Sequence, residues 1–275
     1  MRLAYQGEPG AYSEAAALVY GGPQAETLPC MTFDEVFEAV VKKKATHGVV
    51  PLENSIGGTI HRNYDLLLEH DLAITGEVEL DVVHCLQALP GTKLSDVKVV
   101  YSHPQALAQC ERYLRRLGVN VEAVYDTAGG AKLVSEGKMV GAAALASRRA
   151  ADVFGLEVLQ EAVQDYEFNI TRFAIIGGAV PTDGNKTTIV FALPSTPGAL
   201  WKALSVFALR DINLSKLESR PIRGRPWEYL FYVEVDARRD DAPCARALMH
   251  LAEFAKWVRV LGTYKGFERP KTGSP

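Results

Sequence analysis

The alternation of apolar and polar positions predicts strands and helices in turn over roughly the first 180 residues. Short apolar runs at 48–51, 98–101 and 142–145 are typical of buried strands, and each leads through polar or glycine-bearing residues into a helical stripe. Another helix is predicted to begin at Thr32 to Glu35, a capping box whose side chains can satisfy backbone N–H groups. Repeated strand and helix units predict an α/β sheet covered by helices on both faces.

One predicted strand differs from the others in its length. From Leu72 to Val82 apolar residues alternate with polar ones, which is the period of two of a strand with unlike faces. A strand this long is better explained by a crossing between two lobes than by the edge of one compact sheet. The pattern therefore favours a bilobed arrangement.

A polar link at 181–186 marks the expected boundary to a second domain. The segments after it predict the order strand, helix, strand, strand, helix, strand, which is the βαββαβ unit of ferredoxin-like domains. Its expected elements are 187–193, 199–210, 214–219, 228–235, about 242–254, and 257–264. No catalytic constellation stands out among them, which favours a regulatory or assembly role.

Composition narrows the classes of protein that fit. A chain of 275 residues predicts two domains, and its net charge of −3 argues against a nucleic-acid partner. No apolar segment is long enough to span a bilayer, so we expect a cytoplasmic protein, although a trimmed organelle precursor would look the same. The four cysteines are scattered without metal-ligand spacing. We expect reduced thiols, no metal site and no cofactor.

Four polar clusters fall where predicted strands end: 53–55, 102–105, 126–127 and 169–172. Each cluster alone is also typical of an ordinary helix cap. Ligands of open α/β sheets bind at the carboxyl ends of strands, against helix N-termini. In the last cluster the Thr171 hydroxyl can donate a proton and the Arg172 guanidinium can hold a carboxylate. Together the clusters favour a site for a small anion.

The ordered set of short motifs along the chain resembles prephenate dehydratases, and the closely related arogenate dehydratases, with a C-terminal ACT domain. The motifs that carry the resemblance are 5–7 with 10–13, 51–55 with 57–58, 102–107, 126–128, 169–173, 198–200 and 218–221. The likeness covers nearly the whole chain and keeps the order of the motifs.

The resemblance implies a catalytic region at 1–180 built like type II periplasmic binding proteins, followed by an ACT domain at 186–268. One lobe would hold about 1–80 and 166–180, and the other about 81–165. The implied reaction is the decarboxylating dehydration of prephenate to phenylpyruvate in phenylalanine biosynthesis. Arogenate as the substrate, giving phenylalanine directly, stays open. A non-catalytic sensor of aromatic or amino acids is the more remote alternative.

The resemblance also assigns roles to site residues. Thr171 is the expected general acid and Arg172 the partner of a substrate carboxylate. Successive residues of an extended strand point to opposite faces, so both can contact one substrate only from a loop before the strand, which we predict. Glu53 is the competing acid. Asn54 and Ser55 are expected in the catalytic set beside it, as donors that position the substrate. Further substrate contacts are expected from Gln105, Thr127, Asn169, Phe173 and His103.

In the ACT domain the resemblance implies a feedback site for phenylalanine. Gly198 permits close backbone approach at a helix N-terminus, where a carboxylate is favoured. The expected site residues are Gly198, Ala199, Leu200, Glu218, Ser219, Arg220 and Pro221. Because ACT domains pair to form such sites, we expect a homodimer or a homotetramer.

Overall fold

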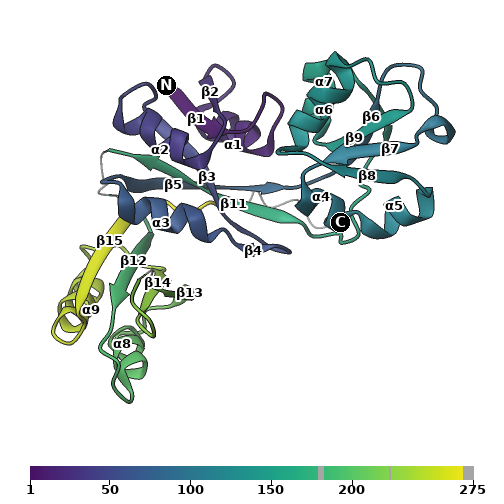
Figure 1. The fold of residues 1–275 in the computed structure, drawn as a ribbon. Coiled ribbons are helices and arrows are strands. Elements are labelled where there is room, and N and C mark those ends of the chain that lie inside the picture. Colours follow the sequence, from purple (N-terminus) through teal and green to yellow (C-terminus); the bar gives the residue numbers. More distant parts are fainter. Residues whose placement is uncertain (179–182, 223, 269–275) are drawn as a thin grey trace, which may run out of the picture. The chain divides into compact units, whose positions relative to one another are not determined.

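A computed structural model describes residues 1–178, 183–222 and 224–268 of the chain (Figure 1). The chain divides into two compact units. The first unit holds Met1–His70 and Val78–Ala174, and the second holds Asp71–Glu77 and the chain from Ile175 onward. The expected link at 181–186 falls partly outside the described residues, as do residues 179–180 at the end of the expected catalytic region.

The first sheet contains six strands, and three helices pack against it (Figure 1). Its elements are β1 (Arg2–Gln6), α1 (Tyr12–Gly21), β2 (Glu26–Cys30), α2 (Phe33–Val41), β3 (His47–Asn54), β4 (Gly58–Thr59), α3 (His61–Glu69), β5 (Ala73–Asp81) and β11 (Ile170–Gly177). The strand order is β2-β1-β3-β11-β5, with β4 paired to β3. β1 pairs in parallel with both neighbours, and its Leu3, Ala4 and Tyr5 are fully buried, as is typical of a strand covered on both faces.

The second sheet contains five strands in the order β10-β6-β9-β7-β8. Its elements are β6 (Cys85–Ala88), the 3₁₀ turn η1 (Leu94–Asp96), β7 (Val99–Ser102), α4 (Pro104–Gln109), α5 (Glu111–Leu117), β8 (Asn120–Ala123), α6 (Thr127–Glu136), β9 (Ala142–Ala146), α7 (Arg148–Phe154) and β10 (Glu157–Gln160). The central strand β9 is buried along its whole length, and its small side chains let α6 pack closely against it.

The chain crosses between these sheets twice. The expected long strand is β5, which ends at Asp81, and the second sheet begins at Cys85. The chain returns between Gln160, at the end of β10, and Ile170, at the start of β11. We call the first sheet with α1–α3 the first lobe, and the second sheet with α4–α7 the second lobe. The bilobed α/β prediction is confirmed.

The sequence also predicts a single helix from Pro104, at its first position, to Leu117, before Gly118, and this prediction is wrong in one respect. Cys110, with φ −118° and ψ 19°, leaves the helical conformation and divides the segment into α4 and α5. Cys110 is completely buried among the apolar residues of the second lobe. The helix therefore breaks where the Cys110 side chain packs into the core, and no glycine or proline in the sequence marks the break.

The loop between β1 and α1, residues 7–11, joins the two lobes. The Glu8 N–H donates to Asp126 Oδ2 at 2.9 Å, and Ser147 Oγ donates to the Gly10 carbonyl at 2.6 Å. Gly10 has a φ of +91°, and a Cβ on it would lie 2.7 Å from Ala150 Cα. Only glycine permits this backbone conformation and this approach together.

The second unit contains the predicted βαββαβ domain. Its elements are β12 (Lys186–Ala192), α8 (Ala199–Ala208), β13 (Leu214–Pro221), β14 (Tyr229–Val235), α9 (Ala242–Ala252) and β15 (Trp257–Tyr264). The sheet is antiparallel in the order β13-β14-β12-β15. Alternate residues of β12 and β14, such as Ile189, Phe191 and Val233, pack with Phe207 of α8 and Leu251 of α9 in one core.

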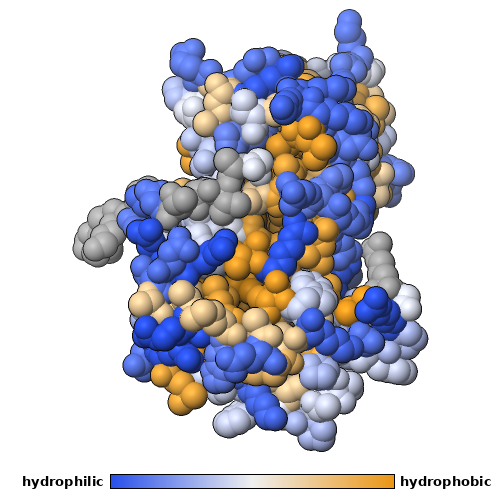
Figure 2. Space-filling view, turned by 90° about the vertical axis from the view of Figure 1, so that its left-hand side faces the viewer, coloured by the Kyte–Doolittle hydropathy of each residue, from blue (hydrophilic) through white to orange (hydrophobic). Residues whose placement is uncertain are grey.

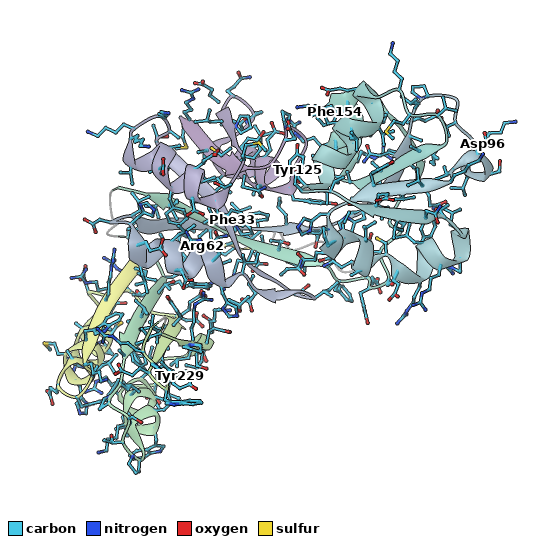
Figure 3. The ribbon with its side chains drawn as sticks, in the orientation of Figure 1. Phe33, Arg62, Asp96, Tyr125, Phe154 and Tyr229 are labelled. Atoms are coloured by element: carbon cyan, nitrogen blue, oxygen red, sulfur yellow. The ribbon has the colours of Figure 1, made fainter. Side chains whose placement is uncertain are left out.

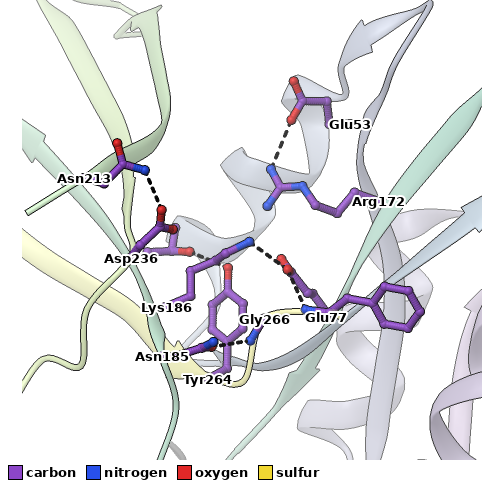
Figure 4. A network of polar contacts seen from close by, with 11 residues as sticks. Glu53, Glu77, Arg172, Asn185, Lys186, Asn213, Asp236, Tyr264 and Gly266 are labelled. Carbon is purple, nitrogen blue, oxygen red and sulfur yellow. Dashed lines mark hydrogen bonds and ion pairs between the residues drawn. The ribbon is translucent and has the colours of Figure 1, made fainter. Parts of the chain in front are cut away.

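A buried ion pair ties the segment Asp71–Glu77 to this domain (Figure 4). Lys186 Nζ lies 2.7 Å from Glu77 Oε1, and the two side chains are only 16% and 3% exposed. The Phe267 N–H donates to the same carboxylate oxygen at 2.9 Å. Because a buried carboxylate needs such partners, the pair holds this part of β5 beside the start of β12.

We expect Gly10→Ala to weaken the joint between the lobes. The added Cβ combines left-handed backbone strain with a clash against α7, which together cost about 3 kcal/mol of the free energy of unfolding. Gly118→Ala is the matched control, because Gly118 has a φ of +71° but open space around it, so strain alone costs about 1 kcal/mol. Urea unfolding followed by circular dichroism measures both. Equal losses would show that the contact with Ala150 does not matter.

Candidate active site

A cavity of about 330 Å³ lies between the first and second lobes. The first lobe contributes the N-terminus of α1, the end of β3, the start of α2 and part of β11. The second lobe contributes the N-termini of α4 and α6. Phe33 and Tyr125, both labelled in Figure 3, line it from the two sides.

Asn54, at the end of β3, is the most connected polar group beside this cavity. Its Nδ2 donates to Asn169 Oδ1 at 2.7 Å, to Thr171 Oγ1 at 3.0 Å and to the Ile170 carbonyl at 3.2 Å. Its Oδ1 accepts from the N–H groups of Ile56 and Gly57 at 3.1 and 2.7 Å. Asn54 is only 5% exposed, so these contacts replace the water that it loses.

The prediction that Thr171 and Arg172 lie in a loop is wrong, because both belong to β11. Side chains alternate along a strand, so Thr171 and Phe173 face the cavity while Arg172 points to the opposite side. There the Arg172 guanidinium donates to Glu53 Oε2 at 3.0 Å (Figure 4). Thr171 and Arg172 therefore do not share one ligand in this structure.

Of the predicted site residues, some line the cavity and others lie outside it. Asn54, Gln105, Thr127 and His103 line the cavity with Thr171 and Phe173. Asn169 lies behind it, in contact with Asn54, whereas Glu53, Arg172 and Ser55 are not among the residues that line it.

Ser55 has a structural contact instead of a place in the cavity. Its Oγ accepts from the Ile170 N–H at 2.9 Å, and its own N–H donates to the Ile170 carbonyl at 2.8 Å. These two hydrogen bonds hold the end of β3 beside the start of β11. Ser55 thereby supports the strand that presents Thr171.

On the second lobe, His103 begins α4. Its Nδ1 accepts from the Gln105 N–H at 3.2 Å, and burial lowers the pKa of the imidazole. The Gln105 side chain packs against Gly57 of the first lobe so closely that a Cβ on Gly57 would collide with it. Gln105 therefore lines the cavity from the second lobe and contacts the first lobe at Gly57. Burial raises the pKa of Asp126, which also lines the cavity.

The start of α1 offers the cavity groups that are suited to an anion, and no lysine or arginine is among the described residues that line the cavity. Ala11, Tyr12 and Ser13 line it at the start of α1, and no described side chain caps that helix. The first N–H groups of a helix have no partner within the helix, and they lie at the positive end of its dipole. They are suited to a carboxylate.

The residues of the site that were not predicted from the sequence include Tyr12, His84 and Gln109. Gln109 follows Gln105 by four residues on α4, and this helical spacing places both on one face. His84 is the one polar residue in the otherwise apolar stretch 82–86, which signals a polar group that is buried for a reason. Tyr12 lies in the motif 10–13 that carries the resemblance, although no role was assigned to it.

The predicted effector residues belong to two elements of the second unit, the start of α8 and the strand β13. Ala199 and Leu200 line a cavity of about 220 Å³ at the start of α8, whose N-cap is Gly198 with a φ of +75°. Glu218, Ser219, Arg220 and Pro221 lie on the edge strand β13 and do not line that cavity.

Within 1–178, 183–222 and 224–268, no group of three or more histidines, cysteines, aspartates or glutamates is placed to hold a metal ion. No helix in these ranges has the length and apolar character needed to cross a membrane.

A two-lobed α/β region with a polar cavity between its lobes, joined to a βαββαβ domain, defines the class of periplasmic-binding-protein-like proteins that carry an ACT domain. The family model for prephenate dehydratase matches residues 3–180, and the model for the ACT domain matches residues 187–248. The chain belongs to the prephenate dehydratase family.

Curated relatives agree over most of the chain. Arogenate dehydratase/prephenate dehydratase 2, chloroplastic, of Arabidopsis thaliana is 50% identical over 277 residues, which cover 96% of this chain and 72% of that protein. Arogenate dehydratase 2 of Petunia hybrida is 49% identical over 282 residues, covering 96% and 71%.

Solved structures show the same fold. The prephenate dehydratase of Arthrobacter aurescens in complex with L-Phe superposes with a TM-score of 0.86 at 31% identity, over 96% of this chain and 90% of that chain. A structure described as a novel type of quorum quenching acylase superposes with a TM-score of 0.89 at 36% identity, over 97% and 98%.

We expect the stability of the protein to fall as the pH drops below about 6.5, partly through His84. Burial lowers the pKa of His84, so the unfolded chain, with an ordinary pKa near 6.5, binds the proton more readily than the folded chain. The stability is therefore complete above that pH and is lost as the pH falls towards the folded pKa. His84→Gln should lose less stability between pH 7.5 and 5.5 than the wild type, measured by thermal unfolding.

His61→Gln, on the exposed start of α3, controls for the removal of one imidazole. If His61→Gln and His84→Gln reduce the pH dependence equally, burial of His84 does not cause it.

Proposed function

We propose that this protein removes water and carbon dioxide from prephenate to give phenylpyruvate, with Thr171 as the general acid. The observation that carries the role of Thr171 is its hydroxyl, which faces the cavity and accepts a hydrogen bond from Asn54 Nδ2 at 3.0 Å. The reaction class is that of the family to which the chain belongs.

The chemistry asks little of the protein beyond orientation and one proton. The bond between the ring and its carboxylate breaks, and the electron pair enters the ring as CO₂ leaves. The opposite C–O bond breaks as the ring becomes aromatic, and the departing hydroxide takes a proton to form water. A general acid placed at that oxygen contributes on the order of 10² to 10⁴ in rate.

Asn54 makes Thr171 a credible donor of that proton. Because Asn54 Nδ2 donates to the Thr171 oxygen, the hydroxyl hydrogen is directed elsewhere, and the side chain faces the cavity. Threonine is a weak acid, so the negative charge left on its oxygen needs stabilisation. The amide N–H already points at that oxygen and stabilises the charge without reorganisation.

The substrate carboxylates are assigned to backbone groups. The N-terminus of α1, at Tyr12 and Ser13, supplies N–H groups for one carboxylate. Gln105, Thr127 and His103 are placed to orient the rest of the substrate, and Phe173 supplies an apolar wall for the ring.

Arg172 and Glu53 receive a supporting role in this proposal. Their pairing across β3 and β11 lies on the side opposite Thr171, and Arg172 is 11% exposed there. The ion pair holds the two strands that present Asn54 and Thr171. Glu53 is therefore not assigned as the acid.

Arogenate is the alternative substrate, since it differs from prephenate only by an amino group in place of the keto group. One curated relative is named for both activities and another for arogenate dehydratase alone. Turnover of the two compounds at equal concentrations decides between them. Acyl hydrolysis, named for one structural neighbour, is assayed with the same preparation.

We expect Thr171→Val to lower kcat more than about a hundredfold, because it removes the proton donor and keeps the shape of the side chain. Thr171→Ser keeps a hydroxyl and should retain part of the activity, and Glu53→Gln should retain most of it. Formation of phenylpyruvate or phenylalanine is measured, with circular dichroism as the folding control. An active Thr171→Val together with an inactive Glu53→Gln would transfer the acid role to Glu53.

Regulation by phenylalanine at the ACT domain completes the proposal. Gly198 starts α8 without a side-chain cap among the described residues, so its first turn is suited to the ligand carboxylate. A solved relative was crystallised in complex with L-Phe. The segment Glu218–Pro221 lies on an edge strand, where a second copy of the domain can bring it to the start of α8.

A homodimer or homotetramer is part of the same proposal. Figure 2 shows hydrophobic residues exposed among hydrophilic ones on one face of the molecule. In the second unit, exposed hydrophobic side chains include Leu217 on edge strand β13 and Trp257 on edge strand β15. We place the protein in the cytoplasm, or in a plastid if a transit peptide was removed, as the name of one relative suggests.

We expect Leu200→Asp to raise the phenylalanine concentration for half-maximal effect at least about tenfold, because the new carboxylate repels that of the ligand at the start of α8. Leu209→Asp is the matched control at the other end of the same helix, and it should change that concentration less than about twofold. Activity is titrated with phenylalanine for both variants. Equal shifts would remove the start of α8 from the effector site.

A further inference from the structure

Asn54 has an amide orientation that the backbone dictates. Its Oδ1 meets the N–H groups of Ile56 and Gly57, which can only donate. Its Nδ2 meets the Ile170 carbonyl, which can only accept. The oxygen and nitrogen of this side chain cannot be exchanged without breaking all three contacts.

That orientation passes to two further buried amides. Asn169 Oδ1 accepts from Asn54 at 2.7 Å, so Asn169 presents its Nδ2 to Gln109 Oε1 at 2.9 Å. Gln109 in turn donates from Nε2 to Asn54 Oδ1 at 3.3 Å. The three amides close a ring of hydrogen bonds behind Thr171, and each has one possible direction.

His84 is attached to this ring. Its Nε2 lies 3.0 Å from Gln109 Oε1, an oxygen that can only accept, so the hydrogen of the imidazole must be on Nε2. Burial lowers the pKa of His84, which keeps the ring neutral and leaves Nδ1 with a lone pair. Nδ1 lies 3.2 Å from the Tyr12 oxygen, whose hydrogen is donated to the Val83 carbonyl.

Tyr12 also holds the plane of the imidazole. The two rings meet edge to face, with centroids 5.7 Å apart and an angle of 82°. The Tyr12 hydroxyl lies 2.7 Å from the Val83 carbonyl as well, so backbone on the far side anchors the tyrosine. His84 is 2% exposed and has little freedom to turn.

We propose that His84 is a positioning residue whose Nε2–H, through Gln109, holds Asn54 and Thr171 in the arrangement needed for proton donation. The inference rests on the proposed function of Thr171. Asn54 keeps a backbone partner on each side without His84, but Gln109 Oε1 then loses one of its two donors. A looser Gln109 leaves Asn169 Nδ2 without a fixed acceptor, so Asn169 is held less tightly against Asn54 and the alignment of the Asn54 and Thr171 hydrogen bond loosens.

Two conservative replacements separate the donor from the bulk of the ring. The amide nitrogen of a glutamine reaches about as far as Nε2 of histidine, whereas that of an asparagine reaches only about as far as Nδ1. His84→Asn should therefore lower kcat at least about tenfold, with KM within about threefold, because the loss falls on the transition state. His84→Gln should keep kcat within about threefold.

The steady-state comparison can contradict the inference in two ways. An unchanged kcat in His84→Asn would show that the donor is dispensable. Equal losses in both variants, at equal thermal stability, would show that only packing of the ring matters. Thermal unfolding of each variant identifies a loss that comes from misfolding.

Nitrogen NMR of histidine-labelled wild-type protein tests the hydrogen position without any activity. The His84 signals, assigned by their absence in His84→Gln, should show a protonated Nε2 and an unprotonated Nδ1 near pH 7.5. The opposite tautomer overturns the inference even if prephenate is turned over. Conversely, a wild type that turns over neither prephenate nor arogenate refutes the proposed function while leaving the tautomer measurement intact.

Discussion

The site depends on one buried amide held between backbone groups. The amide oxygen of Asn54 accepts from two N–H groups of its own turn. Its amide nitrogen donates to a carbonyl of β11 and to the hydroxyl of Thr171. Removing an amide from water is costly unless each polar atom finds a partner, so the chain around Asn54 has to take a particular shape. The turn after β3 and the start of β11 are therefore fixed together, and the cavity takes its polar wall from that junction.

Alternation along β11 separates two tasks on adjacent residues. Thr171 faces the cavity, and Arg172 faces the ion pair with Glu53 on the other side. The guanidinium therefore pairs with Glu53 away from the cavity, and the proposed function assigns the binding of anions to the start of α1. Backbone N–H groups suit this task, because they are already oriented before the ligand arrives and no flexible cation has to be ordered around it.

Periodicity predicted much of the fold because most elements have one buried face. β15 spans Trp257–Tyr264 as expected, and the order of elements in the second unit follows directly. The strands β2, β6 and β10 had no such signal, since they are four or five residues long, and β2 also contains Pro29. The break at Cys110 likewise depends on packing within the second lobe, which no local rule contains.

The sequence could predict which residues lie near the site, but not which of their side chains face the cavity. Polar clusters at strand ends located Asn54 and Thr171, because the topology brings such ends to one cavity. Whether a residue there faces the ligand depends on where the strand begins, and a start one residue away reverses the answer. Partners such as Gln109 and Asn169 lie 60 residues apart in the chain, and only the folded lobes reveal that they meet. The catalytic role proposed for Thr171 thus rests on contacts that local sequence does not encode.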